Sequence, residues 1–246
     1  MTLKCIGSGS SGNSYALIDN DNKILLLDLG LPAKEIKQAI DYRISDVVGA
    51  VVTHRHSDHS KSVEDFEKMG IHPYRPYVED RPYIPSYIPV HFKKFTVQAF
   101  DLTSKDGKWM HTNADGSECP CYGFLITHPD MGRLLYVTDT ELVKWRFKDI
   151  NHILISCNYQ SKYMECGEAK RNHVLMGHME LETVKEFIKT NNSNALRNVI
   201  LCHLSRDNAN AEEMVAEVQK IVPGANVDYA RAGLEVELRR ADECPF

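Results

Sequence analysis

Two patterns of apolar positions alternate along this chain: short runs of branched apolar residues, and longer segments with helical spacing. The runs predict strands at 23–28, 47–53, 95–100, 133–139, 153–156 and 198–202. The helical spacing predicts helices at 33–41, 60–69, 179–190 and 210–222. Either Asn208 or Asn210 is suited to cap the last helix, and Pro223-Gly224 to end it. Because strands and helices alternate in both halves, an α/β fold is expected.

Metal-binding residue types stand at the ends of several predicted strands. The pairs concerned are Leu27-Asp28, Thr53-His54, Thr138-Asp139 and Cys202-His203. Aspartate commonly ends strands, so a single case would carry no weight. In layered α/β folds, however, ligands collect beyond the carboxyl ends of strands. We therefore expect these side chains to converge.

One stretch differs in composition from the rest of the chain. Residues 72–89 hold five of the ten prolines together with Tyr74, Tyr77, Tyr83 and Tyr87. Proline excludes a regular helix here, so residues 72–94 are predicted to form a loop or lid with short extended pieces. We expect its tyrosines mainly to pack on the domain, with base stacking as the alternative. The whole chain, 1–246, is interpreted as a single domain.

Composition excludes several classes of protein. The 246 residues carry 29 Lys plus Arg and 34 Asp plus Glu, a formal charge of −5. An acidic chain without a Lys/Arg-rich tract does not favour a broad surface for duplex DNA. Its apolar runs are too short to cross a bilayer, and its first residues do not resemble a secretory signal. Seven scattered cysteines, an odd number, favour reduced thiols and a cytoplasmic location, in a bacterium or in an infected host cell.

The strongest chemical signal is the hexapeptide His54-Arg55-His56-Ser57-Asp58-His59, directly after a predicted strand. Imidazole and carboxylate together suit zinc, manganese or iron. His54 and His56 can point from an extended turn to one ion. Asp58 and His59, at the start of the next helix, can reach a second ion. Crowding of these residue types by chance in a solvated loop is a poor alternative.

This His-x-His-x-Asp-His motif resembles that of the metallo-β-lactamase superfamily, and the resemblance covers nearly the whole chain. It implies a four-layer αβ/βα sandwich that holds two divalent ions, zinc or alternatively manganese. The implied ligands of one ion are His54, His56 and His111, those of the other are Asp58, His59 and His203, and Asp139 bridges the two.

Among the ligands that the resemblance implies, the third histidine of the first ion is the one that the sequence identifies least directly. Asp101-Leu102-Thr103 stands where family members commonly have that ligand, and an insertion around 101–121 follows. His111 is our choice, and an exposed loop histidine is the alternative. The resemblance also implies that Asp28 fixes the orientation of the motif's imidazoles. A hydroxide between the ions would attack the substrate, with Asp58 orienting it.

A narrower resemblance comes from residues 7–14 (GSGSSGNS), from Gly177-His178-Met179-Glu180 and from His203-Leu204-Ser205. These resemble the branch that contains the WalJ/YycJ-type nucleases and the anti-Pycsar phosphodiesterases. Ser11 and Asn13 are candidate substrate contacts in the Gly/Ser loop, which is alternatively a plain tight turn. Asn158 is a third candidate, although Ser156-Cys157 precedes it where relatives often have an acidic residue.

His178 is predicted to contact phosphate or to protonate the leaving oxygen, because it stands at the start of a predicted helix. A simple capping role is the alternative, and His173 is a weaker candidate for the same place. The remaining histidines, at 72, 91, 128 and 152, are interpreted as surface or packing residues.

The predicted function is a metal-dependent phosphodiesterase that acts on nucleotides. A small cyclic mononucleotide of the cyclic CMP/UMP type is favoured, with evasion of Pycsar immunity as the implied role, because the acidic chain does not favour a long polyanion. Clustering of a few basic residues in the folded chain would overturn that preference. A WalJ-type DNA or RNA nuclease is the first alternative, and a non-catalytic binding module stabilised by metal is the second. The resemblance also implies a homodimer.

Overall fold

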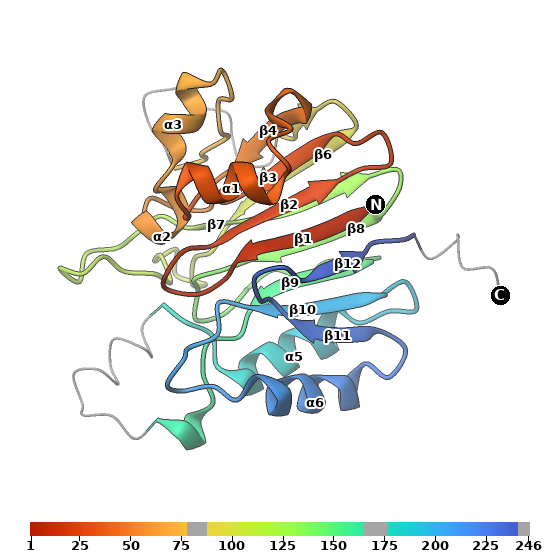
Figure 1. The fold of residues 1–246 in the computed structure, drawn as a ribbon. Coiled ribbons are helices and arrows are strands. Elements are labelled where there is room, and N and C mark those ends of the chain that lie inside the picture. Colours follow the sequence, from red (N-terminus) through yellow and green to blue (C-terminus); the bar gives the residue numbers. More distant parts are fainter. Residues whose placement is uncertain (78–87, 165–176, 241–246) are drawn as a thin grey trace.

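The computed structural model describes residues 1–77, 88–164 and 177–240, and its strands form two sheets. The first sheet has the order β12-β1-β2-β3-β4 and the second β11-β10-β9-β8-β7-β6-β5 (Figure 1). The strands are β1 Thr2–Gly7, β2 Ser14–Ile18, β3 Ile24–Leu27, β4 Val47–Val51, β5 Val90–Phe92, β6 Phe95–Asp101, β7 Tyr122–His128, β8 Gly132–Val137, β9 His152–Ser156, β10 Asn198–Cys202, β11 Asn226–Tyr229 and β12 Glu235–Glu237.

Helices cover the outer side of each sheet. They are α1 Ala33–Ala39, α2 Ser57–Ser60, α3 Val63–Lys68, α5 Leu181–Asn191 and α6 Ala211–Ile221, with 3-10 turns at Ile44–Asp46 and Ser161–Tyr163. In Figure 1, α5 and α6 lie together against the second sheet, and α1 and α3 lie at the first. The order helix, sheet, sheet, helix is the predicted four-layer sandwich.

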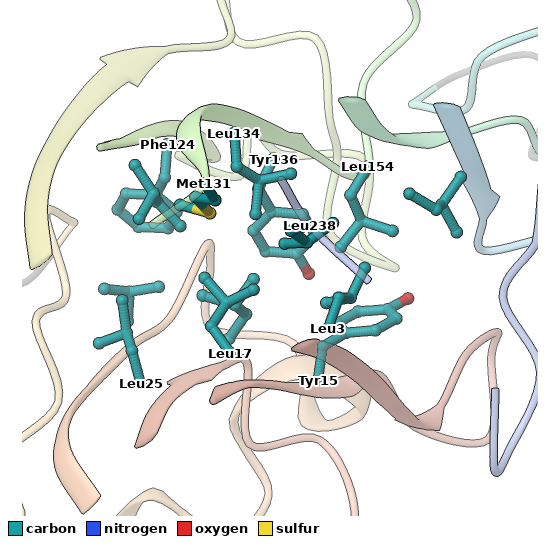
Figure 2. Close-up of a cluster of buried hydrophobic side chains, with 14 of the residues drawn as sticks. Leu3, Tyr15, Leu17, Leu25, Phe124, Met131, Leu134, Tyr136, Leu154 and Leu238 are labelled. Atoms are coloured by element: carbon teal, nitrogen blue, oxygen red, sulfur yellow. The ribbon is translucent and has the colours of Figure 1, made fainter. Parts of the chain in front are cut away.

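Three apolar clusters hold these layers together. Side chains from both sheets fill the central cluster, among them Leu17 and Leu25 from the first and Phe124 and Leu154 from the second (Figure 2). The α5 and α6 faces pack on the second sheet, and the α1 and α3 faces pack on the first. The apolar face predicted for 179–190 is confirmed, because Leu181, Val184, Phe187 and Ile188 are buried.

The predicted helix at 60–69 is wrong in one respect, because two short helices, α2 and α3, occupy the region. The backbone N–H of Ser62 donates to the carbonyl of Leu29 instead of to a helical carbonyl. The Ser62 hydroxyl donates to the carbonyl of Leu31. These bonds to the β3–α1 connection interrupt the helix between Ser60 and Val63. As predicted, Asp58 and His59 lie in the first of the two helices.

The structure shows which of the two asparagines caps the last helix. Asn210 precedes α6 and its side chain accepts from the N–H of Glu213, whereas Asn208 does not cap it.

The proline- and tyrosine-rich segment is partly a strand. Val90–Phe92 forms β5, which pairs with β6, and Tyr74 makes a bridge to Val51. The Tyr74 ring packs on the central cluster and lies 6.1 Å from the ring of Phe124. Tyr83 and Tyr87 lie outside the described residues.

Within the described ranges, no helix combines the length and the apolar character needed to cross a bilayer. Of the seven cysteines, those at 5, 119, 121, 157 and 202 are free thiols, and Cys166 and Cys244 fall outside those ranges.

Candidate metal centre

Parallel strand pairing brings the predicted ligands to one edge of the sandwich. β3 pairs in parallel with β4, and β8, β9 and β10 form a parallel set in the second sheet. Chain segments that leave the carboxyl ends of these strands therefore emerge together. Asp28 and His203 follow β3 and β10 directly, and both have φ of 54°, a left-handed conformation that turns the chain sharply at the strand end.

The first group of ligand atoms is histidine only. Nitrogen atoms of His54, His56 and His111 lie within 4.8 Å of one another. The shortest distance, from His111 Nε2 to His56 Nδ1, is 2.9 Å. His111 comes from the 101–121 segment, far from the motif in sequence, and only 5% of it is exposed. It is not the exposed loop histidine of the alternative.

The second group combines carboxylates and imidazoles. Asp58, His59, Asp139 and His203 offer atoms within 4.8 Å of one another. His59 Nε2 lies 3.5 Å from Asp58 Oδ2 and 3.2 Å from Asp139 Oδ2. His203 Nε2 lies 3.5 Å from the same Asp58 oxygen.

Asp139 lies between the two groups. Its Oδ2 atom is 3.6 Å from His54 Nε2 and 3.7 Å from His111 Nε2, both in the first group. The same oxygen contacts His59 of the second group. A carboxylate in this position is within reach of two ions at once, as the bridging assignment requires.

The ring orientations test whether these residues fit metal ions. His56 Nε2 lies 3.2 Å from Asn113 Oδ1, so its Nδ1 faces His111. His59 Nδ1 lies 2.7 Å from Asp28 Oδ2, so its Nε2 faces Asp58 and Asp139. Each of these two imidazoles thus has one nitrogen held by a neighbour and the other turned to the cluster, which is how ligating histidines are normally supported.

Buried nitrogens without hydrogen-bond partners also indicate that these residues fit metal ions. His54 Nε2 and His203 Nε2 are buried and have no hydrogen-bond partner among the described residues. Leaving such atoms unsatisfied costs free energy unless a ligand binds them. Nitrogen and oxygen donors in this mixture suit divalent zinc or manganese, so the residues present fit a pair of divalent ions.

The electrostatics also suit cations. Burial lowers the pKa of His54 well below its ordinary value, and that of His111 to about 4, so both rings are neutral. Burial raises the pKa of the Asp139 carboxyl, but His203 and His59 outweigh this and hold it well below its usual range. Burial raises the pKa of Asp58, but the neighbouring imidazoles of His203 and His59 outweigh burial and lower it well below its usual range. Neutral imidazoles and ionised carboxylates are the forms that bind metals.

His59 is the exception. Burial lowers its pKa, but the charges of Asp139 and Asp28 outweigh burial and raise the pKa well above its ordinary value. A dication beside Nε2 would compete with the proton held there.

Asp28 lies behind the cluster and contacts His59 from the side away from the other ligands. Both its oxygens accept hydrogen bonds from Thr53, and Oδ2 also contacts His59 Nδ1 and the Tyr136 hydroxyl. Thr53 Oγ1 also lies 3.1 Å from His54 Nδ1. Sequence reasoning missed Thr53 and Tyr136. Thr53 precedes His54 directly, which is a usable signal, whereas Tyr136 looks like an ordinary core aromatic in its strand.

His178 lies at the rim of the two groups. Its ring stacks on His203, with centroids 5.4 Å apart, and its Nδ1 is 3.8 Å from Asp139 Oδ1. The predicted position at a helix start is wrong, because α5 begins at Leu181 with Glu180 as its N-cap. His178 is therefore held by the turn at Gly177 (φ 98°) and not by the helix terminus. His173 lies outside the described residues.

The three candidate substrate contacts fall in different environments. Asn13 is buried and its side chain bonds to Gly9 and to the carbonyl of Asp58, so it braces the Gly/Ser loop. Ser11 is exposed on that loop. The Asn158 amide donates to the carbonyl of His203 and lies 3.1 Å from its Nδ1, so Asn158 holds His203 in place.

Comparison with known proteins finds matching relatives. The sequence model of a family described as the metallo-beta-lactamase superfamily matches residues 7–152. An exodeoxyribonuclease YycJ of Bacillus anthracis is 28% identical, over 82% of both chains. An exodeoxyribonuclease WalJ of Streptococcus pneumoniae serotype 2 is 26% identical, over 91% of this chain and 90% of its own. Among solved structures, the metallo-beta-lactamase fold protein YhfI from Bacillus subtilis superposes with a TM-score of 0.66 at 15% identity, covering 96% of this chain and 98% of its own.

Proposed function

This chain belongs to the metallo-beta-lactamase superfamily and is a metal-dependent hydrolase, and we propose that it cleaves phosphodiester bonds of nucleotides. The observation that carries the proposal is the position of Asp139 between the two ligand groups, with one oxygen 3.2–3.7 Å from imidazole nitrogens of both. We assign one ion to His54, His56 and His111, and the other to Asp58, His59 and His203, with Asp139 shared. Zinc is the preferred ion and manganese the alternative.

When bound, two such ions would lower the pKa of the attacking water and would neutralise charge on phosphate oxygens. The residues around them have separate tasks. The ionised Asp58 carboxylate accepts a hydrogen bond from the attacking water and so orients it. Asp28 and Asn158 keep His59 and His203 in the required orientation. To His178, which lies beside Asp139 and is partly exposed, we assign the donation of a proton to the leaving oxygen.

Small cyclic mononucleotides are the first substrates to test. The net charge of −5 gives a long polyanion no general attraction, whereas a single phosphate needs only the ion pair. Cyclic CMP and UMP are the specific candidates, and their removal would silence a cyclic-nucleotide immune signal. A homodimer is part of this proposal, and light scattering that finds only a 28.0 kDa particle would contradict it.

Exodeoxyribonuclease activity is the second candidate. It is favoured by the curated relatives, which bear that name and align with most of this chain.

The test is hydrolysis by the purified, metal-loaded protein of labelled single-stranded DNA and RNA and of cyclic CMP, UMP, AMP and GMP, with product analysis. Asp139→Asn is the control for contaminating enzymes. Cleavage of cyclic nucleotides with intact polymers supports the first candidate, and the reverse supports the second. If the protein cleaves none of these substrates, or if Asp139→Asn is as active as the wild type, phosphodiester hydrolysis at this centre is wrong.

A further inference from the structure

A groove of about 720 Å³ lies on the outer face of the second sheet, and none of its lining residues belongs to the metal centre. Gln98 and Phe100 of β6 and Leu125 of β7 contribute to its floor. Residues 145–148 contribute its wall. The metal-centre chemistry leaves this groove unexplained.

The groove is lined by more positive than negative charge, although the chain as a whole is acidic. Arg133, Arg146 and Lys148 line it. Asp101 also lines it, but its carboxylate is paired with Lys144 Nζ at 2.6 Å. Arg133 Nη1 donates to the carbonyl of Lys148 at 2.6 Å, which ties the wall to β8. Among the described residues, Arg133, Arg146 and Lys148 form no ion pair with a carboxylate, and they lie on one connected surface.

Two aromatic side chains are fixed between these cations. Trp145 is 43% exposed, and its indole N–H donates to the carbonyl of Asp101 at 2.9 Å. Phe147 packs on Phe100 with ring centroids 4.9 Å apart, and its backbone N–H donates to Asn191. An exposed indole held in this way can stack on a ligand at a small cost in side-chain entropy.

Charge and aromatic character alternate along the wall and the residue before it, in the sequence Lys144-Trp145-Arg146-Phe147-Lys148. This short basic tract corrects the view that the chain has none. Folding adds Arg133, which comes from the start of β8. Net charge alone does not show such a local cluster of basic residues, which would favour a polyanion at this surface.

The groove is also connected to the metal centre through the chain. The wall, residues 145–148, follows Asp139 closely in sequence. Asp101 is the first residue of the 101–121 segment, which carries His111. On β6 the groove is lined from Gln98 to Asp101, and register places Arg133, which also lines it, at the level of Thr96, five residues from Asp101. At about 3.3 Å per residue this is about 17 Å, room for several stacked nucleotides.

We propose that this groove binds single-stranded DNA, with backbone phosphates at Arg133, Arg146 and Lys148 and a base stacked on Trp145. Aromatic faces interleaved with cations are the usual means of holding single strands without sequence preference. The proposal rests on the phosphodiesterase function, in the form of its second candidate, the cleavage of DNA. A phosphate backbone accounts for three cations on one surface directly, whereas lysine is depleted at protein–protein interfaces.

The direct test is fluorescence anisotropy with a labelled phosphorothioate oligothymidylate, which resists hydrolysis, and the metal-loaded protein. Arg146→Glu combined with Lys148→Glu is expected to raise Kd at least about tenfold and to flatten the salt dependence. Trp145→Ala is expected to raise Kd by about 5- to 100-fold. Lys34→Glu combined with Lys68→Glu, an equal charge change at exposed positions of α1 and α3, is the matched control and should keep the wild-type Kd.

A second readout uses the two tryptophans of the chain. In Trp109→Phe, Trp145 is the sole tryptophan, and stacking of a base should quench its fluorescence as the oligonucleotide is added. In the groove variants, hydrolysis of bis(p-nitrophenyl) phosphate should stay at the wild-type rate while KM for DNA rises.

The outcomes separate this proposal from the function on which it rests. The proposal that DNA binds in this groove would be wrong if the groove variants kept the wild-type Kd and KM. It would also be wrong if the Lys34/Lys68 control lost as much affinity for the oligonucleotide as they do. Light scattering in which the variants turn a dimer into a monomer while oligonucleotide binding is unchanged would overturn it as well, because the groove would then be a self-association surface. Groove-dependent binding by a protein that hydrolyses no phosphodiester would instead overturn the proposed function alone.

Discussion

The hydroxyl of Tyr136 lies 2.5 Å from Oδ2 of Asp28, in the buried space between the two sheets. The same Asp28 oxygen contacts Nδ1 of His59, whose other nitrogen faces Asp58 and Asp139. A core tyrosine is therefore linked to the candidate metal centre through one carboxylate. Partners of this kind set the ring orientation and the basicity of a ligating histidine.

Tyr136→Phe is expected to weaken metal binding by about 10-fold or more, because Asp28 loses one of the bonds that fix it behind His59. Competition with a chromophoric chelator measures the affinity. Tyr74→Phe is the matched control, since Tyr74 packs on the same cluster and its hydroxyl has no hydrogen-bond partner among the described residues. Equal metal affinity in Tyr136→Phe and the wild type would exclude this linkage.

His178→Gln is expected to lower kcat for phosphodiester hydrolysis by about 10²- to 10⁴-fold, the usual contribution of a general acid. Metal content should stay at the wild-type level, because His178 lies at the rim of the ligand groups. Elemental analysis and steady-state kinetics measure the two quantities. His91→Gln, at an exposed position on β5, should change neither. Loss of metal in His178→Gln would instead make His178 a ligand.

Gly30→Ala is expected to destabilise the protein by more than about 2 kcal/mol. A Cβ atom at Gly30 would lie 1.7 Å from the carbonyl oxygen of Asp58, which also accepts the backbone N–H of Asn13. The short helix that carries Asp58 and His59 would have to move. Urea unfolding measures the loss, and Gly224→Ala, where a Cβ meets nothing within 4 Å, should be close to neutral. A similar effect of both substitutions would show that this close packing is unimportant.

Removal of metal by a chelator is expected to lower Tm by about 5–10 °C, since ions that bind only the folded chain stabilise it by mass action. Differential scanning calorimetry with and without chelator gives the shift. In Asp139→Asn, which lacks the shared carboxylate, the chelator should have a much smaller effect. An unchanged Tm for the wild type would mean that these side chains bind no metal.

The pH dependence of stability should contain a contribution from His152, which is buried away from the metal centre. Burial lowers its pKa to about 4, and its ring nitrogens contact the Met131 carbonyl and the Asn198 amide, a pattern that fits the neutral ring. The unperturbed pKa of histidine is about 6.5. Above that pH, His152 is neutral in both the folded and the unfolded chain, and its full contribution to the free energy of unfolding is present. As pH falls from 6.5 to 4, the unfolded chain binds a proton that the folded chain excludes.

Stability should therefore fall in that window, by at most about 1.4 kcal/mol per pH unit from this group. Urea titrations of the wild type and His152→Gln between pH 4 and 8 measure it. The difference between the two proteins isolates His152 from other titrating groups. Parallel pH profiles would show that this ring does not exclude the proton.

The sequence by itself determined the features that are local. Apolar periodicity located the strands β3, β4, β6, β8, β9 and β10 and the helices α5 and α6, because burial of one face imposes the pattern within the element. The hexapeptide from His54 to His59 identified most of the candidate ligands, because its donors are adjacent in the chain. Asp139 and His203 were found as residues that follow apolar strands.

Tertiary structure decided whatever depends on partners distant in sequence. The 60–69 helix breaks because Ser62 bonds to Leu29 and Leu31, and helical spacing cannot show that competition. His111 joins His54 and His56 only when the 101–121 segment folds over the sheet edge. Arg133 reaches the wall of residues 145–148 in the same way. Net charge sums over the whole chain, whereas a phosphate responds to the charges within a Debye length of its site, and only the fold brings those together.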